Sequence, residues 1–458
     1  MTNVDLDEIY AVPIRDRWLM FKPRARVSAM MNRAAVDSLR NSLAGGIAPV
    51  SGSLAGLRRW LAAGDAAAGA SGAEPFPAGK LVIVPTRTCN MRCVYCDFGA
   101  AGDDGTTIDP RQACRFVEFM ADSMAREGRG ILGVHFFGGE PLIARDVVDT
   151  VVHHTRSLCS RLKIKPWFEV TTNAMIEPSY AGFVGDYFDA AVVSFDGLPD
   201  FHDRHRRNLD GSSSSGTVER TIRELSKYPV EICLRACITA ESAGSMRGMV
   251  EFLSRNFAFD VLCFESLQAN DECGASGVSA PGPFDFAKGF LEASDLGMRN
   301  GIRVINAQAQ LAFPRSSSCP VGTGAVMLMP DGMVTACYLP AGRWLARGMD
   351  LTVGRVAPDG RVEIDRSKMQ AIREQACEKP RCRRCFCRLS CAGGCHVSHT
   401  PPGCLPEYDG HCLQTRAITA GLLVRELSGE DALKELLENN EWMEQLSNNP
   451  DDRLSAWK

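Results

Sequence analysis

The sequence has no excess of basic residues: its 51 lysines and arginines are matched by 55 acidic residues, and the formal net charge is -4. Charge therefore gives no reason to expect nucleic acid or an anionic membrane as a partner. The sequence also lacks an apolar run long enough to span a bilayer, and its acidic first residues, MTNVDLDEIYAVPIRDR, lack the apolar core of a secretory signal. We expect a cytoplasmic protein that contacts neither nucleic acid nor membrane.

Cysteine is the residue in excess. The chain of 458 residues has 19 cysteines, an odd number, and most of the closely spaced ones fall in two clusters. In a reducing cytosol such clusters hold metal more often than disulfides. Isolated thiols are expected to be small buried hydrophobes, and these include Cys114, Cys159, Cys233 and Cys263.

The N-terminal part predicts a small module of strands and helices. Short alternating segments around RWLMFKPRARVSAMMN precede RAAVDSLRNSL, and SLAGLRRWLAAG indicates one more helix. The segment GDAAAGASGAEPFPAG, residues 64–79, is too rich in Gly, Ala and Pro to build a core, so we predict a linker there.

Six β-branched runs follow from Lys80, each separated from the next by enough residues for a crossover helix. The runs are KLVIVPT, GVHFFG, WFEVTTN, AAVVSFD, VEICLRACIT and FDVLCFE. The first helix has a clear start, because Asp109 can cap it and Pro110 suits its first turn. Six such units imply an α/β fold with a parallel sheet, either doubly wound or curled into part of a barrel. In parallel barrels the chemistry gathers at the C-terminal ends of the strands, where the unusual residues of this chain fall.

After about residue 311 we expect a loop-rich, cysteine-rich segment. It opens with AVMLMPDGMVTACY, which predicts two strands joined by a Pro-Asp-Gly turn. Near the end, GEDALKELLENNEWMEQL predicts one acidic amphipathic helix. We expect its apolar residues to dock on the protein's own surface, and these are Leu433, Leu436, Leu437 and Met443.

Three cysteines crowd the loop after the first predicted strand, in the segment KLVIVPTRTCNMRCVYCDF. A zinc site needs a fourth ligand and a disulfide needs an even number of thiols, whereas three thiolates can hold three irons of an iron-sulfur cube. The open iron can then chelate adjacent amino and carboxylate groups. The spacing of Cys89, Cys93 and Cys96, C-x3-C-x2-C with Tyr95 before the last cysteine, resembles the signature of the radical SAM superfamily. A zinc loop with a distant fourth ligand is the alternative.

The resemblance implies a cofactor, a chemistry and a fold. Members of that family bind S-adenosylmethionine (SAM) at a 4Fe-4S cluster and cleave it reductively, releasing a 5'-deoxyadenosyl radical that abstracts hydrogen from the substrate. The fold implied is a partial (β/α)6 TIM-like barrel, here with a small N-terminal α+β module and a loop-rich, cysteine-rich C-terminal iron-sulfur domain.

Later strand ends supply the remaining candidates for binding SAM. In FFGGEP, Gly138 and Gly139 would let the backbone approach the methionine end of SAM, and Glu140 would meet its ammonium group. The segments TTN and SFDG offer small polar groups, although strand-end caps look the same. These groups are Thr171, Thr172, Asn173, Ser194 and Asp196, with Gly197.

Basic residues after the fourth strand are candidate partners of the SAM carboxylate. The segment SFDGLPDFHDRHRRN resembles an S-x-D-G-x(n)-H-D-x-x-R pattern of peptide-modifying branches, which includes His202, Asp203 and Arg206. Arg220 is our candidate for binding the carboxylate and Arg235 is the second choice, with an ordinary salt bridge as the alternative for both.

The second cysteine cluster resembles the seven-cysteine SPASM domain, which holds two auxiliary 4Fe-4S clusters. Its spacing is C-x12-G-x4-C, then C-x2-C-x5-C-x3-C and a final cysteine, with Gly332 as the glycine. The resemblance assigns Cys319, Cys337 and Cys395 to auxiliary cluster I, and Cys382, Cys385, Cys391 and Cys412 to auxiliary cluster II. A zinc ribbon is the alternative. Three cysteines lie outside the pattern as expected spectators, unless one completes cluster I: Cys377, Cys387 and Cys404.

These features predict four regions. Residues 1–79 form the module and linker, 80–310 the radical SAM barrel, 311–425 the SPASM domain, and 426–458 the C-terminal helix. The resemblance implies three 4Fe-4S clusters, SAM, a precursor peptide as substrate, and an electron donor such as flavodoxin or ferredoxin. The N-terminal module is a candidate for binding a leader peptide through a strand edge.

The expected function is oxidative modification of a ribosomally made peptide, by crosslinking or a similar reaction. One alternative is an anaerobic sulfatase maturase that forms formylglycine, and another is a zinc-binding peptide scaffold without catalysis. Sulfatase maturases typically have an Asp base directly after the second SPASM cysteine, where this chain has Tyr338, so the departure disfavours that alternative. Asp331 and Glu265 are further candidate bases by position, Glu265 with a salt bridge as its alternative role.

Overall fold

The computed structural model describes residues 5–44, 53–62, 80–98, 105–268, 271–312, 314–315, 317–318, 325–377, 379–399 and 408–457. The predicted linker at 64–79, Cys319 and Cys404 lie outside these residues.

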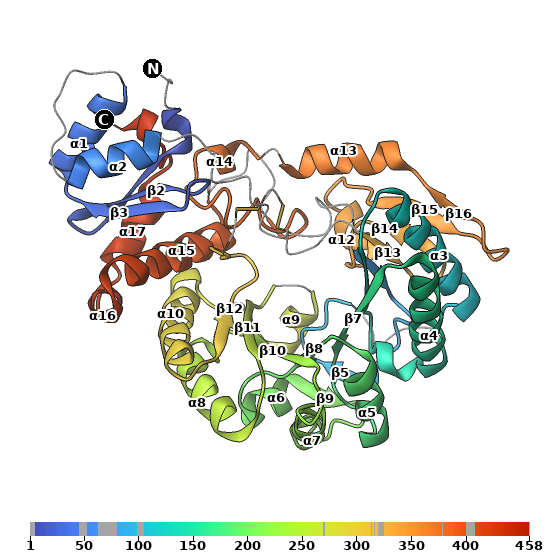
Figure 1. Cartoon of the computed structure of the whole chain (residues 1–458). Helices are drawn as coiled ribbons and strands as arrows, with labels where there is room; N and C mark the ends of the chain where they lie inside the picture. The colour runs from blue at the N-terminus through green and yellow to red at the C-terminus, as the bar shows by residue number, and fades with distance from the viewer. Residues whose placement is uncertain are drawn as a thin grey trace.

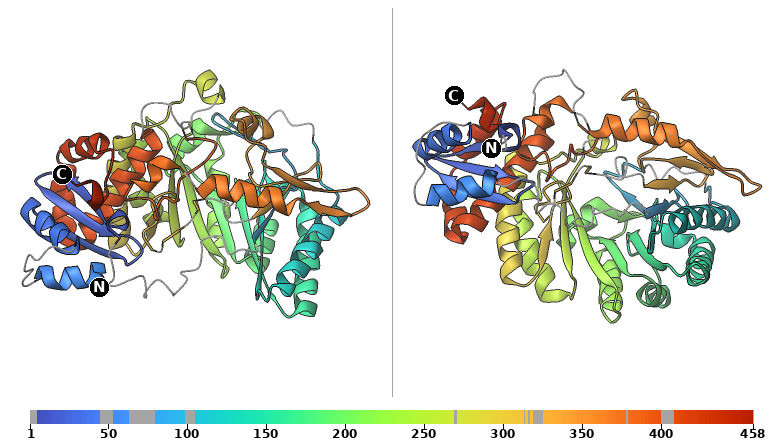
Figure 2. Two further views of the ribbon diagram at one scale, coloured as in Figure 1. Left: turned by 90° about the horizontal axis from the view of Figure 1, so that it is seen from above. Right: turned by 45° about the horizontal axis from the view of Figure 1, so that its top comes forward.

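Six parallel strands form the centre of the fold, and they coincide with the six predicted runs. They hydrogen-bond in the order β11-β10-β8-β7-β6-β4, and each neighbouring pair is parallel. The sheet curves and the helices lie on its outer side (Figures 1 and 2), which confirms the predicted α/β partial barrel. The strands are β4 (Lys80–Ile83), β6 (Ile131–Phe136), β7 (Lys165–Thr172), β8 (Ala190–Ser194), β10 (Glu231–Ile238) and β11 (Val261–Ser266).

Helices follow these strands, and the longer ones cover the outside of the barrel. The side chain of Asp109 accepts a hydrogen bond from the N–H of Arg111 and Pro110 is the first residue of α3, which confirms the predicted helix start. The longer helices are α3 (Pro110–Arg126), α4 (Arg145–Leu162), α5 (Pro178–Tyr187), α7 (Ser215–Leu225), α8 (Met246–Asn256) and α10 (Pro283–Arg299), and the short ones are α6 (Pro199–His205) and α9 (Asp271–Ser276).

The sheet extends beyond the barrel at both edges. β12 (Arg303–Ile305) adds to β11, and β13 (Val326–Leu328) adds parallel to β4 before it turns into β14 (Met333–Thr335). This hairpin confirms the strands predicted around the Pro-Asp-Gly turn.

The following segment has more regular structure than the loop-rich region we expected. β15 (Thr352–Val356) and β16 (Val362–Ile364) form a second hairpin, and the helices here are α12 (Ala341–Leu345), α13 (Arg366–Cys377) and α14 (Pro380–Arg383). This second hairpin, whose strands are short, was not predicted from the sequence. Its turn signal was nevertheless present, because APDG at residues 357–360 repeats the signal of the first hairpin.

The N-terminal module is a three-stranded antiparallel sheet with two helices. It consists of β1 (Tyr10–Ile14), β2 (Arg17–Lys22), β3 (Val27–Met31), α1 (Arg33–Leu43) and α2 (Ser53–Ala62). The C-terminal residues Leu454 and Trp457 join its apolar core, and Arg453 pairs with Tyr10 at the outer edge of β1. The two ends of the chain therefore pack together (Figure 1).

The C-terminal segment has three helices: α15 (Gly410–Ser428), α16 (Glu430–Leu437) and α17 (Glu441–Asn448). The single helix predicted for GEDALKELLENNEWMEQL is therefore wrong, because the chain breaks between α16 and α17. Asn439 explains the break, since its side chain accepts a hydrogen bond from the N–H of Glu441 and competes with the helix. The predicted docking of the apolar face is confirmed by the burial of Leu433, Leu436, Leu437 and Met443.

Candidate active site

The three motif cysteines lie on the loop that follows β4, at the C-terminal side of the barrel strands. Met91–Cys93 form the short strand β5, which pairs antiparallel with β9 (Arg206–Asn208), so Cys93 lies opposite Arg206. Cys89, Cys93 and Cys96 are half-buried and none forms a disulfide. The loop therefore presents three thiols of the type that an iron-sulfur cluster requires.

Burial keeps two of these thiols, Cys89 and Cys93, protonated until a metal displaces the proton. Burial, reinforced by the charge of Glu140, raises the pKa of Cys89 to about 12. Burial also raises the pKa of Cys93 to about 11, although the charge of Arg206 opposes this shift. Loading of a cluster at this loop must therefore release protons.

Asn173, at the end of β7, connects the cysteine loop to the barrel. Its Nδ2 lies 3.4 Å from Cys89 Sγ and 2.8 Å from Asn90 Oδ1. Its backbone N–H donates to Glu140 Oε2 at 2.6 Å, and Thr172 Oγ1 donates to Glu140 Oε1 at 2.8 Å. The fully buried carboxylate of Glu140 thus ties the end of β6 to the end of β7 directly beneath the loop.

The environment of Glu140 differs from that of a simple surface carboxylate. Burial raises its pKa to about 7, while the hydrogen bonds from Asn173, Leu142 and Thr172 act in the opposite direction. The three donors already occupy both oxygens. The predicted contact of Glu140 with the SAM ammonium remains a prediction, and the structure adds a role in joining two strands.

Gly138 and Gly139 allow two backbone segments to touch. A Cβ on Gly139 would lie 2.1 Å from the carbonyl oxygen of Arg87 and 2.3 Å from that of Thr88. Gly138 has φ of 145° and a Cβ there would lie 2.5 Å from the carbonyl oxygen of Thr86. The glycines are therefore needed for the loop after β6 to support the segment that leads into Cys89.

A buried polar network holds the other side of the cysteine loop. Asp196, directly after β8, accepts hydrogen bonds from Arg206 Nε at 3.0 Å and from the backbone N–H of Cys237 at 3.1 Å, and Tyr95 OH donates to its second oxygen. Burial by itself would raise the pKa of Asp196, but Arg206, with help from His205, His202 and Tyr95, holds that pKa well below its usual range. A charged Asp196 is therefore anchored beneath the loop.

The H-D-x-x-R segment builds this network. His202 accepts a hydrogen bond from the N–H of Asp196 at 3.3 Å, and its ring stacks on Phe195. Asp203 accepts from the N–H groups of Ser214 and Ser215 at the start of α7. The side chain of Arg206 reaches both Asp196 and the ring of Tyr95, whose centroid lies 5.4 Å from its guanidinium carbon. Arg206 thus lies next to the cysteine loop; the sequence pattern included this residue but predicted neither its position nor a role.

The structure does not gather every predicted SAM-binding residue. Thr171 hydrogen-bonds His135 Nε2 at 3.0 Å inside the barrel, and Ser194 ends β8 in a half-buried position. Arg220 is exposed on α7, where it donates to Thr217 of its own helix at 2.8 Å. Its proposed contact with the SAM carboxylate therefore has no support from its neighbours and remains a prediction.

The barrel interior is lined by charged and thiol groups. Lys80 forms an ion pair of 2.8 Å with Glu169, and His135 lies 3.4 Å from the same carboxylate. On β10 the residues that alternate toward the interior are only half-buried, and Arg235 is one of them. Burial lowers the pKa of His135 to about 4, so this imidazole is neutral at pH 7.

The three candidate bases have different surroundings. Glu265, near the end of β11, accepts a hydrogen bond from Cys263 Sγ at 3.2 Å. Tyr338 packs against Phe137 with ring centroids 5.0 Å apart, within an apolar cluster that also contains Phe98 of the cysteine loop. Asp331 is exposed in the β13–β14 turn, where it accepts from the N–H of Met333. Glu265 and Tyr338 remain candidates, whereas the contacts of Asp331 are those of a turn residue.

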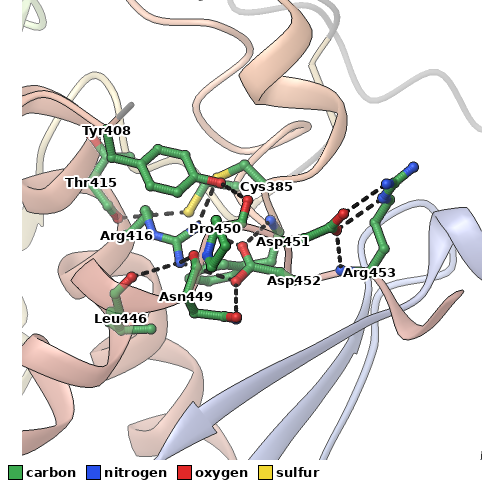
Figure 3. Close-up of polar contacts among 12 residues, drawn as sticks. Cys385, Tyr408, Thr415, Arg416, Leu446, Asn449, Pro450, Asp451, Asp452 and Arg453 are labelled. Atoms are coloured by element: carbon green, nitrogen blue, oxygen red, sulfur yellow. Dashed lines mark hydrogen bonds and ion pairs between the residues drawn. The ribbon is translucent and has the colours of Figure 1, made fainter. Parts of the chain in front are cut away.

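Four cysteines of the second pattern converge. Cys382, Cys385, Cys391 and Cys412 line one small cavity, together with Cys387. Arg416 of α15 borders the same cavity and its Nη1 lies 3.4 Å from Cys385 Sγ (Figure 3). Four thiols around one cavity suit a 4Fe-4S cluster, whose irons are held by cysteine thiolates.

Two of the three cysteines assigned to cluster I lie within the described residues. Cys337 is buried two residues after the end of β14, and Cys395 is half-buried. Cys319, their predicted partner, lies outside the described residues, as do Cys404 and the side chain of Cys377. Cys387 is buried, and its thiol lies 3.9 Å from the carbonyl oxygen of Thr415.

One group of side chains has the close spacing of ligand atoms that a single metal ion needs. Zn–S bonds of about 2.3 Å in a tetrahedral site place sulfurs about 3.8 Å apart. Within the described ranges, the one group of three metal-binding side chains whose ligand atoms all lie within 4.8 Å of one another is His399, Asp409 and Cys412. Cys89, Cys93 and Cys96 are not part of this group.

No helix among the described residues has the length and apolar character needed to cross a membrane.

Comparisons with known proteins agree with this geometry. The profile of the Radical SAM superfamily matches residues 83–253. A cysteine-type anaerobic sulfatase-maturating enzyme of Clostridium perfringens is 24% identical over 341 residues, which are 70% of this chain and 89% of that protein. The structure of native anSMEcpe with bound AdoMet and Kp18Cys peptide is similar with a TM-score of 0.59 and 20% identity, over 79% of this chain and 99% of that one.

A second solved structure covers still more of the chain. Streptococcus suis SuiB bound to precursor peptide SuiA is similar with a TM-score of 0.51 and 15% identity, over 87% of this chain and 96% of that one. The likeness thus extends beyond the barrel. The matched profile and the three-thiol loop confirm the predicted radical SAM identity and its SAM-binding 4Fe-4S cluster: the chain is a radical SAM enzyme, matched to that superfamily over residues 83–253.

Proposed function

We propose that this enzyme oxidatively modifies a ribosomally made precursor peptide and that its C-terminal cysteines hold two auxiliary 4Fe-4S clusters. The observation that carries the proposal is the cavity lined by Cys382, Cys385, Cys391 and Cys412, on a chain that also carries the SAM-binding cysteine loop. The resemblance to SPASM domains assigns these four cysteines to cluster II. Cluster I would be held by Cys319, Cys337 and Cys395.

The two kinds of metal centre suit a net two-electron oxidation. When bound, SAM and its cluster supply a 5'-deoxyadenosyl radical that removes one hydrogen atom from the substrate. Formation of a product that lacks two hydrogens then requires one more electron and one proton to leave the substrate. The auxiliary clusters, where bound, would accept this electron, and an external acceptor of the ferredoxin or flavodoxin class would then take it from the protein.

A base inside the barrel takes the proton. Glu265 is the better candidate, because its carboxylate lies near the C-terminal end of β11 and its contact there is a thiol rather than a salt bridge. Tyr338 packs in an apolar cluster, and in this proposal it would contact the substrate rather than accept a proton. The chain itself thus orients the substrate and receives the proton, while the cofactors supply the radical.

The N-terminal module is suited to hold the leader of a precursor peptide. The C-terminal segment occupies the outer edge of β1, since Ala11 N–H donates to the carbonyl oxygen of Asp452 and Leu454 N–H donates to that of Ile9. Among the described residues, β3 (Val27–Met31) is the opposite edge of this sheet. An extended peptide can add to such an edge through main-chain hydrogen bonds.

The proposal is tested with protein reconstituted under anaerobic conditions. With SAM and a reductant the wild-type chain should release 5'-deoxyadenosine, and Cys93→Ala should not. Cys114→Ala, a change at a buried thiol of α3 outside both patterns, is the matched control and should retain activity. Undiminished release by Cys93→Ala would contradict the proposal.

The substrate is sought as a short reading frame beside the gene. Co-expression of the two, followed by mass spectrometry of the peptide, should show a loss of two hydrogens if a crosslink forms. An unchanged mass would instead point to epimerisation and would contradict the net oxidation.

A second candidate function is formylglycine formation on a sulfatase. It is favoured by the similarity to the Clostridium perfringens enzyme over 70% of this chain, and disfavoured by Tyr338 at the position of the expected base. Production of formylglycine on a sulfatase-type cysteine peptide would establish it. Zinc without acid-labile sulfide in the purified protein would instead favour the non-catalytic scaffold.

A further inference from the structure

A fully buried ion pair lies beside the cavity of the four cysteines. Arg416 of α15 and Asp452 of the C-terminal segment are both inaccessible to solvent. Arg416 Nη2 donates to Asp452 Oδ1 at 3.0 Å, and Nη1 donates to the other oxygen. The same guanidinium donates to the carbonyl oxygens of Leu446 at 3.0 Å and Asn449 at 3.3 Å (Figure 3).

The cation of this pair contacts a predicted cluster ligand. Arg416 Nη1 lies 3.4 Å from Cys385 Sγ, within hydrogen-bond distance for a sulfur acceptor. Two aromatic rings enclose the guanidinium, with ring centroids 4.3 Å away for Tyr408 and 5.3 Å away for Phe386. The contact is therefore shielded from water and is electrostatically stronger than the same contact at a surface.

The anion of the pair approaches the same cysteine from the backbone side. Asp452 Oδ2 accepts the N–H of Phe386, which follows Cys385, at 3.0 Å. The backbone N–H of Asp452 donates to the carbonyl oxygen of Arg384, which precedes Cys385, at 2.9 Å. The cysteine is thus bracketed by one buried positive and one buried negative charge.

Such charges act on an iron-sulfur cluster in opposite directions. Reduction adds one electron to the cluster and no proton, so the reduced form carries one more negative charge. A cation that hydrogen-bonds a ligand sulfur stabilises the reduced form and raises the reduction potential, whereas a nearby carboxylate lowers it.

We propose that Arg416 and Asp452 set the reduction potential of auxiliary cluster II, Arg416 raising it through Cys385 and Asp452 lowering it. The inference rests on the proposed function, because it requires a cluster at Cys382, Cys385, Cys391 and Cys412. Both residues are positioning residues, since they act through Cys385 and not on the substrate. The pair would fix how readily this centre accepts the electron that leaves the substrate.

The test measures cluster potentials in the full-length reconstituted protein by redox titration monitored by electron paramagnetic resonance. Arg416→Met should lower one of the cluster potentials by at least about 59 mV. For a one-electron reduction this is a tenfold change in the equilibrium constant. Asp452→Asn, which keeps an oxygen to accept from Phe386, should move the same potential upward by a similar amount. The other potentials should stay unchanged.

A matched control comes from the neighbouring residue. Arg453 pairs with Asp451 at 2.7 Å in the same segment, but no contact joins its described side chain to a cysteine (Figure 3). Arg453→Met should therefore leave all potentials at their wild-type values. Arg416→Lys, which keeps the charge, should shift the potential less than Arg416→Met.

A purely structural tether would give a different pattern. Both single variants would then lose iron and sulfide, and the clusters that remain would keep their potentials or shift in the same direction, which overturns the proposal. If Arg416→Met fails to assemble the cluster, the potentials of Asp452→Asn and Arg416→Lys test the proposal instead. A wild-type potential in Asp452→Asn then overturns the proposal. Absence of any auxiliary cluster in the wild type overturns both proposals, whereas opposite shifts without peptide modification support this one alone.

Discussion

Arg206 and Asp196 form a buried ion pair, with Nε and Oδ1 3.0 Å apart. The pair joins β9, which hydrogen-bonds to β5 of the SAM-binding cysteine loop, to the end of β8. The side chain of Arg206 is 12% exposed and that of Asp196 is 1% exposed. Because both charges are removed from water, each depends on the other, and the loop that carries Cys93 depends on both.

Asp196→Asn should therefore weaken the cysteine loop. Arg206 would be left as an uncompensated buried charge, which costs about 3–5 kcal/mol of unfolding free energy. We expect a lower melting temperature together with loss of iron from the SAM-binding cluster, measured by calorimetry and iron analysis. Arg204→Gln on α6 is the control: it breaks the exposed ion pair with Glu241, and a change above about 1 kcal/mol there would argue against the importance of burial.

Gly139→Ala should separate the loop after β6 from the cysteine loop. The added Cβ would lie 2.1 Å from the carbonyl oxygen of Arg87, so the backbone must move, at a cost of about 1–3 kcal/mol. We expect weaker SAM binding and slower release of 5'-deoxyadenosine. The matched change Gly130→Ala meets no atom within 4 Å and should behave like the wild type. Equal SAM affinity in both variants would show that the close approach is unimportant.

Stability should fall as the pH falls through the range in which unfolded histidine titrates. Burial lowers the pKa of His202 to about 4 in the folded protein, against about 6.5 when unfolded. Below about pH 6.5 the unfolded chain binds a proton that the folded chain refuses, so His202 lowers the unfolding free energy by about 1.4 kcal/mol per pH unit until about pH 4.

His202→Asn removes this titration while keeping an acceptor for the N–H of Asp196. Urea denaturation at pH 7 and pH 5 should show a smaller loss of stability in the variant than in the wild type. His135, whose pKa is also lowered by burial, retains its own contribution in both proteins. The prediction fails if the two proteins lose stability equally over this range.

Substitution of Cys385 and of Cys387, one at a time, should show which of the two thiols is a cluster ligand. Both are buried and both line the cavity of the second cluster, but only Cys385 belongs to the seven-cysteine pattern. We expect Cys385→Ala to lose the iron and sulfide of one cluster and Cys387→Ala to retain them. The reverse result, measured by iron and sulfide analysis of the reconstituted chains, would reassign the fourth ligand.

Much of this protein could be inferred from local patterns. The six parallel strands follow from β-branched runs at regular spacing, and the start of α3 follows from Asp109 and Pro110, because hydrophobic periodicity and capping act over a few residues. The break between α16 and α17 at Asn439 was missed, since the acidic amphipathic pattern continues through it. The second hairpin was also missed, although its Pro-Asp-Gly signal was available.

Among the candidate binding residues, the cysteines were predictable from the sequence, whereas the arginine beside the cysteine loop was not. Spacing alone marked the three cysteines of the SAM loop and the cysteines of the second pattern. It selected Arg220 for the SAM carboxylate, whereas the structure leaves Arg220 exposed and brings Arg206 beside the loop. A single sequence shows which arginines exist, but their distance from a site depends on which strands pair.

The order and spacing of the cysteines, the strands and the turns determined the family, the barrel and the ligand candidates, because those signals are contained in short segments. The tertiary structure decided which charges surround the ligands. Asp452 pairs with Arg416, which lies 36 residues earlier in the sequence. The next residue, Arg453, pairs with Tyr10 of β1 near the other end of the chain. Such pairings depend on how elements distant in sequence are packed together, and burial then gives the resulting charges their strength.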